Sequence, residues 1–169
     1  MPDQKPPRVD GSERETLMAL LRYQRDSLLR KLAGISEDDS RLALVGTGTT
    51  LAWLVRHMTR AETQWMVVRF AGHEPVPAGD TVPPGGIVLP DDAVQPSDTV
   101  ASLSAGYRAA WAMTDAIVAD SDLDEPCRGN EGDTPVRLRW VLMHLLEETA
   151  RHAGHADILR ELIDGSTGR

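Results

Sequence analysis

The sequence predicts an all-α fold, a four-helix bundle, and three observations support this prediction. Apolar residues recur at intervals of three and four in four separate stretches, as they do on helices that bury one face. No stretch alternates apolar and polar residues over the length of a strand. One long connection, Ala71–Pro96, carries six prolines and four glycines. Because a connection of this length can return along a whole bundle, we expect a crossover that makes the second and third helices parallel.

The first helix is expected over Thr16–Ala33. Ser12 and Glu15 form a capping-box pattern before it, and Gly34 is a natural stop after it. Residues 1–11 are polar and contain three prolines, so we expect a flexible tail followed by a single domain over 12–169. The segment after the helix, Ile35–Gly48, is expected to be a loop.

The second and third helices flank the long connection. Thr49 or Thr50 is expected to cap the second helix, which runs to about residue 70. Ser97 or Asp98 is expected to cap the third helix, which runs to about residue 119. The three-and-four spacing places six residues on the apolar face of the second helix: Leu51, Leu54, Met58, Ala61, Trp65 and Val68.

The fourth helix, Pro135–Asp164, has Thr134 as its expected N-cap and Gly165 after its end. Its apolar stripe also carries Glu148 and His152, which are one turn apart. An ionised carboxylate on an apolar face is costly unless it is paired or bound to a cation, so this helix holds the first candidate functional residues. The apolar members of the stripe are Leu138, Val141, Leu142, Leu145, Ala156, Leu159 and Ile163.

Charge and composition exclude several classes of function. The net charge is −8 and no basic run occurs, which argues against binding to a nucleic-acid backbone. No apolar stretch reaches the roughly 20 residues that span a bilayer, and the first residues lack an apolar signal segment, so we expect a cytoplasmic protein. The one cysteine, Cys127, excludes an intrachain disulfide and is interpreted as an ordinary loop thiol.

Three residues of metal-ligand type fall on the inward faces of two helices: His57, Glu148 and His152. Bundle metal sites are built from such inward side chains, and imidazole and carboxylate groups suit zinc and other divalent ions. A set of two histidines and one glutamate leaves coordination positions open, as in catalytic sites. The alternative is that His57 is a core histidine with a hydrogen-bond partner.

The other histidines fit such a site less well. His144 lies one turn before Glu148, but His144 and His152 are about 12 Å apart along a straight helix, too far for one ion. His155 is expected either to support the site from its second shell or substrate side, or to make a hydrogen bond across the bundle or to solvent. His73 lies in the long connection and is expected to be exposed to solvent. The tryptophans are expected mostly in the core: Trp53, Trp65, Trp111 and Trp140.

Two segments, TTLAWLVRHMTRAETQW and HLLEETARHAGHADILRELIDG, resemble the DinB-like superfamily, and most closely its actinobacterial branch related to mycothiol-dependent maleylpyruvate isomerase. The resemblance covers about Ser12 to Gly168. It implies an up-down-down-up bundle and a divalent ion, zinc first and nickel as the alternative, bound by His57, Glu148 and His152. Where this chain has His155, many members have glutamine. The superfamily takes its name from DNA damage, which does not imply DNA binding.

The resemblance favours a metal-dependent S-transferase that uses a low-molecular-weight thiol such as mycothiol on a small electrophile. A coordinated thiol loses its proton, which would supply the nucleophile. The alternatives are a non-catalytic metal-containing stress or binding protein and a thiol-dependent isomerase. The resemblance also implies a homodimer, for which the connection segment VPPGGIVLP is the expected contact surface.

Overall fold

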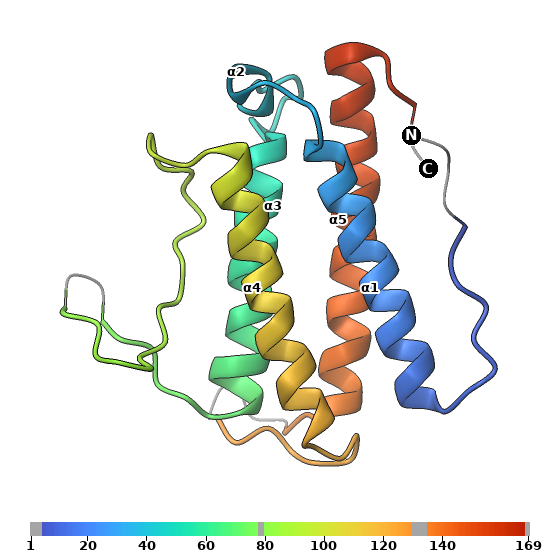
Figure 1. Ribbon diagram of the computed structural model, residues 1–169, viewed down its shortest axis with the longest axis vertical. Coiled ribbons are helices and arrows are strands. Elements are labelled where there is room, and N and C mark those ends of the chain that lie inside the picture. The colour runs from blue at the N-terminus through green and yellow to red at the C-terminus, as the bar shows by residue number, and fades with distance from the viewer. Residues whose placement is uncertain (1–4, 78–79, 130–134, 168–169) are drawn as a thin grey trace.

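The computed structural model describes residues 5–77, 80–129 and 135–167, and within these ranges the protein is helical and contains no β-strand (Figure 1). The predicted all-α class is therefore confirmed. No helix in these ranges is long and apolar enough to cross a membrane. The elements, in order, are α1 (Glu13–Leu32), α2 (Glu37–Ser40), α3 (Leu51–Glu62), the π-helix η1 (Thr63–Phe70), α4 (Val100–Ala119) and α5 (Leu138–Asp164).

The four long rods pack together in two pairs: α1 lies along α5, and α3 with η1 lies along α4. In Figure 1, α1 rises to the upper end of the molecule, α3 and η1 descend, α4 starts again at the upper end, and α5 rises. The connection between η1 and α4 returns along the outside of the bundle, at the left of the view. Residues 51 and 100 therefore lie at the same end of the bundle.

Two apolar clusters fill the interior, one toward each end. One includes Leu28, Leu54 and Leu159, and the other includes Leu21, Met66 and Leu142. Each cluster draws residues from α1, α5 and the α3–η1 rod, so the burial of these faces holds the rods together.

A layer of buried polar residues lies between the two apolar clusters, and the sequence did not reveal it. Arg25 of α1 and Glu62 of α3 are fully buried and form an ion pair, with Arg25 Nε 3.3 Å from Glu62 Oε2. The second guanidinium edge of Arg25 binds Asp115 of α4 at 3.1 Å. Thr114 and Thr149 are also fully buried, so every long rod contributes to the layer.

The helix caps agree with the sequence in two cases and differ in one. Ser12 and Glu15 form the predicted capping box, and Thr50 caps α3 by accepting a hydrogen bond from the backbone of Trp53. For α4, the cap is Thr99, not Ser97 or Asp98, because Thr99 forms a reciprocal pair with Ser102.

The expected loop Ile35–Gly48 contains one further turn of helix, α2. Ser36 caps it by accepting a hydrogen bond from the backbone of Asp39, and its last residue, Ser40, is buried. The acidic residues that suggested a loop occupy its first turn, where negative charge stabilises a helix N-terminus.

The fourth long helix begins at Leu138, three residues later than expected. The chain at this point pairs with residues 123–127. The Cys127 backbone nitrogen donates to the Val136 carbonyl, and the Leu138 and Arg139 nitrogens donate to the carbonyls of Glu125 and Leu123. These bonds hold Pro135–Arg137 extended, so Pro135 does not occupy the first helical position. The expected cap, Thr134, lies outside the described residues. The helix ends at Gly165 as predicted, with φ +75°.

The second predicted helix changes from α to π geometry after Glu62. The Ala71 nitrogen bonds to the Met66 carbonyl, five residues back, at 3.0 Å. Because the π-helix is wider, its inward face shifts by about one residue relative to an α-helical reading. Ala61, Trp65 and Val68, which the sequence placed on the apolar face, are half-buried and not at its centre. Ala61 and Trp65 nevertheless pack against the core clusters. The buried positions are Glu62, Thr63, Met66, Val67 and Phe70.

The long connection is attached to α3 by arginines. Arg56 donates to the Asp91 carbonyl at 2.8 Å and pairs with Asp98 at 3.3 Å, and Arg60 donates to the Pro90 carbonyl at 2.8 Å. Residues 90–98 are thereby fixed against the face of α3 that carries His57.

Candidate functional site

The structure brings His57, Glu148 and His152 together between α3 and α5. The rings of His57 and His152 lie 5.0 Å apart, centroid to centroid, and are nearly perpendicular. The Nε2 atom of His152 is 3.2 Å from Glu148 Oε2. The side chains of His57, Glu148 and His152 are 27%, 28% and 15% exposed, so the cluster is reachable from solvent.

Glu148 and His152 lie at the edge of the apolar stripe, not on it as the sequence reading placed them. The buried line of α5 runs through Leu145, Thr149 and Ala153. One residue is about 100° of helical arc, so Glu148 and His152 are rotated from this line toward α3 and solvent. The carboxylate therefore keeps access to water and does not carry the cost of full burial.

The electrostatics of the cluster favour a neutral His152. Burial lowers the pKa of His152, and the neighbouring His57 lowers it further, against the opposing effect of Glu148. When Nε2 donates to Glu148, Nδ1 of a neutral ring carries a lone pair. That Nδ1 is buried and has no hydrogen-bond partner within the described part of the chain. Two imidazoles and a carboxylate, with one imidazole nitrogen left without a partner, are a donor set that suits a divalent cation.

The arrangement is not that of a closed metal site. In the ranges that the structure covers, no three His, Cys, Asp or Glu side chains are already placed to hold one ion. The chemistry of the donors at His57, Glu148 and His152 fits a divalent ion, and rotation of these side chains would be needed to converge on it.

Asp92, in the long connection, is a site residue that sequence reasoning missed. Its Oδ1 atom lies 3.3 Å from Nδ1 of His57, and Oδ2 lies 3.8 Å from Nε of Arg60. The ring of Trp53 stacks on His57 at 4.8 Å with an interplanar angle of 8°. His57 is thus held on one side by an indole ring and on its Nδ1 edge by a carboxylate. Asp92 follows His57 by 35 positions and lies in an irregular connection, so the spacing of the two residues in the sequence does not predict their contact.

The remaining histidines have different surroundings. His144 stacks on Trp140 at 5.0 Å and meets Trp65 edge-on at 4.7 Å, so it belongs to an aromatic cluster and not to the site. His155 is half-buried and close enough to lower the pKa of His152 slightly. Its supporting role stays a prediction. His73 is exposed, as predicted.

The tryptophans and the cysteine also differ from one another in burial. Of the four tryptophans expected mostly in the core, only Trp111 is buried, whereas Trp140 is 45% exposed because it projects from the outer side of α5. Cys127 is half-buried, and burial raises its thiol pKa, which lowers the thiolate fraction at neutral pH. This agrees with an ordinary thiol and not with a nucleophile.

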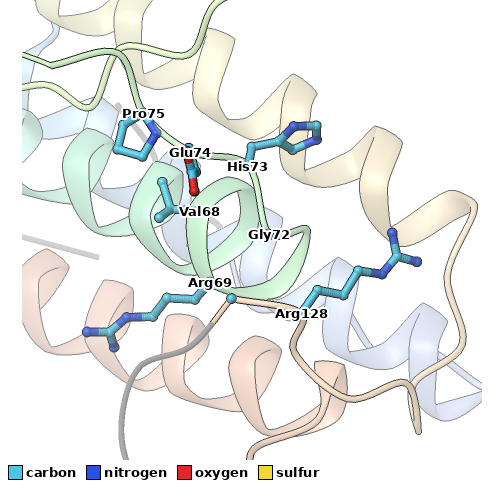
Figure 2. A pocket seen from close by; sticks show the side chains of 8 residues that line it. Val68, Arg69, Gly72, His73, Glu74, Pro75 and Arg128 are labelled. Atoms are coloured by element: carbon cyan, nitrogen blue, oxygen red, sulfur yellow. The ribbon is translucent and has the colours of Figure 1, made fainter.

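A pocket of about 380 Å³ lies away from this cluster, at the end of η1 (Figure 2). Its lining includes His73, Glu74, Arg69 and Arg128, but Figure 2 shows Arg69 and Arg128 extending away from each other. The cationic groups therefore do not converge on a common ligand position, and the half-exposed cluster on α3 and α5 remains the candidate site.

Comparisons with known proteins identify a family and a fold. A family model described as Mycothiol-S-transferase matches residues 16–165. A solved structure, described as a conserved protein from Enterococcus faecalis, superposes with a TM-score of 0.65 at 16% identity, over 92% of this chain and 99% of the other. At that identity the likeness shows the fold alone. No curated protein matches the sequence.

Proposed function

Because this chain belongs to the mycothiol-S-transferase family, we propose that it is a metal-dependent transferase that joins the sulfur of mycothiol to a small electrophile. Family membership implies mycothiol as the thiol co-substrate. The observation that supports the metal is the cluster of two imidazoles and one carboxylate, with a buried and unpartnered Nδ1 on His152.

In this proposal, His57, Glu148 and His152 act as ligands to zinc or nickel, and no general base is needed among them. A bound divalent ion would supply a Lewis acid that lowers the pKa of a coordinated thiol. Asp92 and Trp53 fix the ring of His57, and the low pKa of His152 keeps its imidazole unprotonated and able to bind a cation. Glu148 contributes a carboxylate beside the two imidazole rings. His155, on the next turn of α5, is proposed to support the site from the side of the substrate.

We further propose that residues 12–169 form one domain with an up-down-down-up order of its long helices. The directions visible in Figure 1 and the family match over residues 16–165 support this proposal. In this order α3 and α5 are antiparallel neighbours. Two rigid helices can therefore hold His57 and His152 at the same height along the bundle.

A conjugation assay tests the transferase. Purified protein is incubated with mycothiol and a bimane or aryl halide electrophile, after chelation and again after addition of Zn²⁺ or Ni²⁺. We expect conjugation that is lost on chelation, restored by the ion and absent from His152→Ala. His73→Ala, which changes an exposed histidine outside the cluster, should keep full activity and serves as the matched control.

Circular dichroism of the chelated protein separates this proposal from its alternative. The bundle buries two apolar clusters and does not need an ion to fold, so its helix content should survive chelation. Loss of helix on chelation, with no conjugation under any condition, would instead indicate a non-catalytic protein whose ion stabilises the bundle. Metal-dependent rearrangement of a thiol adduct would indicate an isomerase.

A further inference from the structure

An aromatic cluster lies beside the candidate metal site, and the proposed transfer chemistry does not use it. The cluster consists of Trp65 on η1 and of Trp140 and His144 on α5. The His144 ring stacks on Trp140 at 5.0 Å with an interplanar angle of 14°, and Trp65 lies 4.7 Å from His144 and 5.3 Å from Trp140, centroid to centroid. Each ring therefore contacts the other two. Because Trp140 is also 45% exposed, the cluster holds an indole ring in place at the surface.

The aromatic cluster and the candidate metal site share two facing rows of side chains. Residues four apart form a row along a helix, and the row on α5 consists of Trp140, His144, Glu148 and His152. On the α3–η1 rod, His57 meets the ring of His152, and Trp65, eight residues later, meets the ring of His144. His144 and His152 are also eight residues apart, so the two rows run antiparallel in a constant register. A ligand at one cluster can therefore extend along the rows to the other.

The π geometry of η1 coincides with the aromatic cluster. The wider helix shifts the inward face by about one residue, so Met66 is buried and Trp65 lies toward the rings of α5. A π-helix of eight residues is uncommon, and π segments occur frequently at functional sites. The unusual helix geometry is thus found where the three rings are assembled.

Arg69 adds hydrogen-bond donors to these rings. Its guanidinium carbon lies 4.0 Å from the centroid of the Trp65 ring, and Figure 2 shows its side chain extending away from Arg128, on the side of η1 that faces α5. A guanidinium group carries N–H donors, which hydroxyl groups accept. A sugar ring combines an apolar C–H face, which can cover an indole, with hydroxyl groups at its edge, which can bond to such donors. The chemistry of the cluster therefore suits a sugar ring.

We propose that the aromatic cluster is a subsite for the sugar part of the thiol co-substrate. This inference rests on the proposed function, in which the thiol is mycothiol. Mycothiol is N-acetylcysteine joined to glucosaminyl-inositol, so its sulfur and its rings lie at different ends of the molecule. Trp140 lies about 12 Å from Glu148 along α5, which is far enough to separate the two ends.

The separation of the two clusters favours the thiol over the electrophile as the ligand of the rings. The reacting atom of an electrophile must lie next to the sulfur, so a small electrophile stays close to His57, Glu148 and His152. The part of the thiol remote from the sulfur has no such constraint and extends along the row toward Trp140. Because Trp140 is already held by two other rings, little side-chain freedom is lost when a ligand stacks on it.

A binding experiment tests the subsite without catalysis. Glucosaminyl-inositol, the part of mycothiol that lacks sulfur, is titrated into the protein at millimolar concentration and followed by ligand-detected NMR. We expect the wild type to bind this fragment and Trp140→Ala to weaken the binding by about tenfold, whereas Trp140→Phe, which keeps a flat ring, should retain most of it. Leu162→Ala, which changes an exposed apolar residue at the other end of α5, is the matched control and should bind as the wild type does. No binding by the wild type, or equal binding by Trp140→Ala with unchanged circular dichroism, would overturn the proposal.

Kinetics with a truncated thiol distinguish failure of the subsite from failure of the proposed function. N-acetylcysteine lacks the sugar rings, so Trp140→Ala should raise the KM for mycothiol by about tenfold and leave kcat and the KM for N-acetylcysteine unchanged. A rise in the KM for the electrophile alone would assign the rings to the electrophile and overturn the proposal. If the wild type binds the fragment through Trp140 but conjugates neither thiol, the subsite is supported and the transferase is contradicted.

Discussion

Two polar clusters lie five residues apart on the α3–η1 rod, and they differ in burial and in the completeness of their partners. At Glu62, the carboxylate is fully buried against Arg25, and Asp115 binds the other edge of that guanidinium. At His57, the side chains are partly exposed, and the Nδ1 atom of the facing His152 has no partner within the described residues. The first cluster has its charges balanced inside the protein, whereas the second presents two imidazoles and a carboxylate whose side chains are partly exposed to solvent.

This difference separates a structural from a functional role. A buried ion pair commits both residues to each other, and removing one leaves an uncompensated charge in the core. By contrast, replacing one member of a half-exposed set of metal ligands should change the stability of the fold little and weaken metal binding strongly. The comparison therefore predicts that changes at Glu62 will act on stability and changes at His57 or His152 will act on metal binding.

The largest expected effect on stability is at Glu62. Glu62→Ala should lower the free energy of unfolding by about 3–5 kcal/mol because Arg25 is left buried with only the half-exposed Asp115. Urea titration followed by circular dichroism measures the loss. His57→Ala, one and a half turns away on the same rod, is the matched control and should cost much less. Equal losses in both variants would remove the distinction between the clusters.

A second effect is expected at Asp92. Asp92→Asn should weaken Zn²⁺ binding by about 10–100-fold, because carboxylates that hold a ligand histidine usually contribute that much. Competition with a chromophoric chelator measures the affinity. Asp91→Asn, its neighbour without a contact to the His57 ring, should bind Zn²⁺ as the wild type does. An unchanged affinity in Asp92→Asn would show that the connection does not support the site.

A smaller effect concerns pH. Burial raises the pKa of Glu62 above its ordinary value of 4.5, against the opposing attraction of Arg25. The folded protein then keeps a proton on Glu62 at pH values where the unfolded chain has lost it, so this contribution to stability falls as the pH rises above about 4.5. The stability of the wild type relative to Glu62→Gln should therefore decline with rising pH. An increase would show that Arg25 controls the ionisation.

The sequence predicted what depends on local spacing. Four apolar periodicities predicted the four rods, and the four-residue spacing of Glu148 and His152 placed them on one face. The spacing did not predict the shift of the inward face at η1, because a π-helix changes the period without a marker in the sequence. Arg25 and Glu62 were missed because a charged residue beside an apolar stripe is usually solvated. Asp92 was missed because its position depends on the path of an irregular connection.

The most direct test of the difference between the two clusters is the metal content of the purified protein, measured by elemental analysis for the wild type and for His152→Ala. We expect about one divalent ion per chain in the wild type and little in the variant, with the same helix content in both. Equal metal in the two proteins, or an absence of metal from a wild-type protein supplied with Zn²⁺ and Ni²⁺, would contradict the assignment of His57, Glu148 and His152 as a metal site.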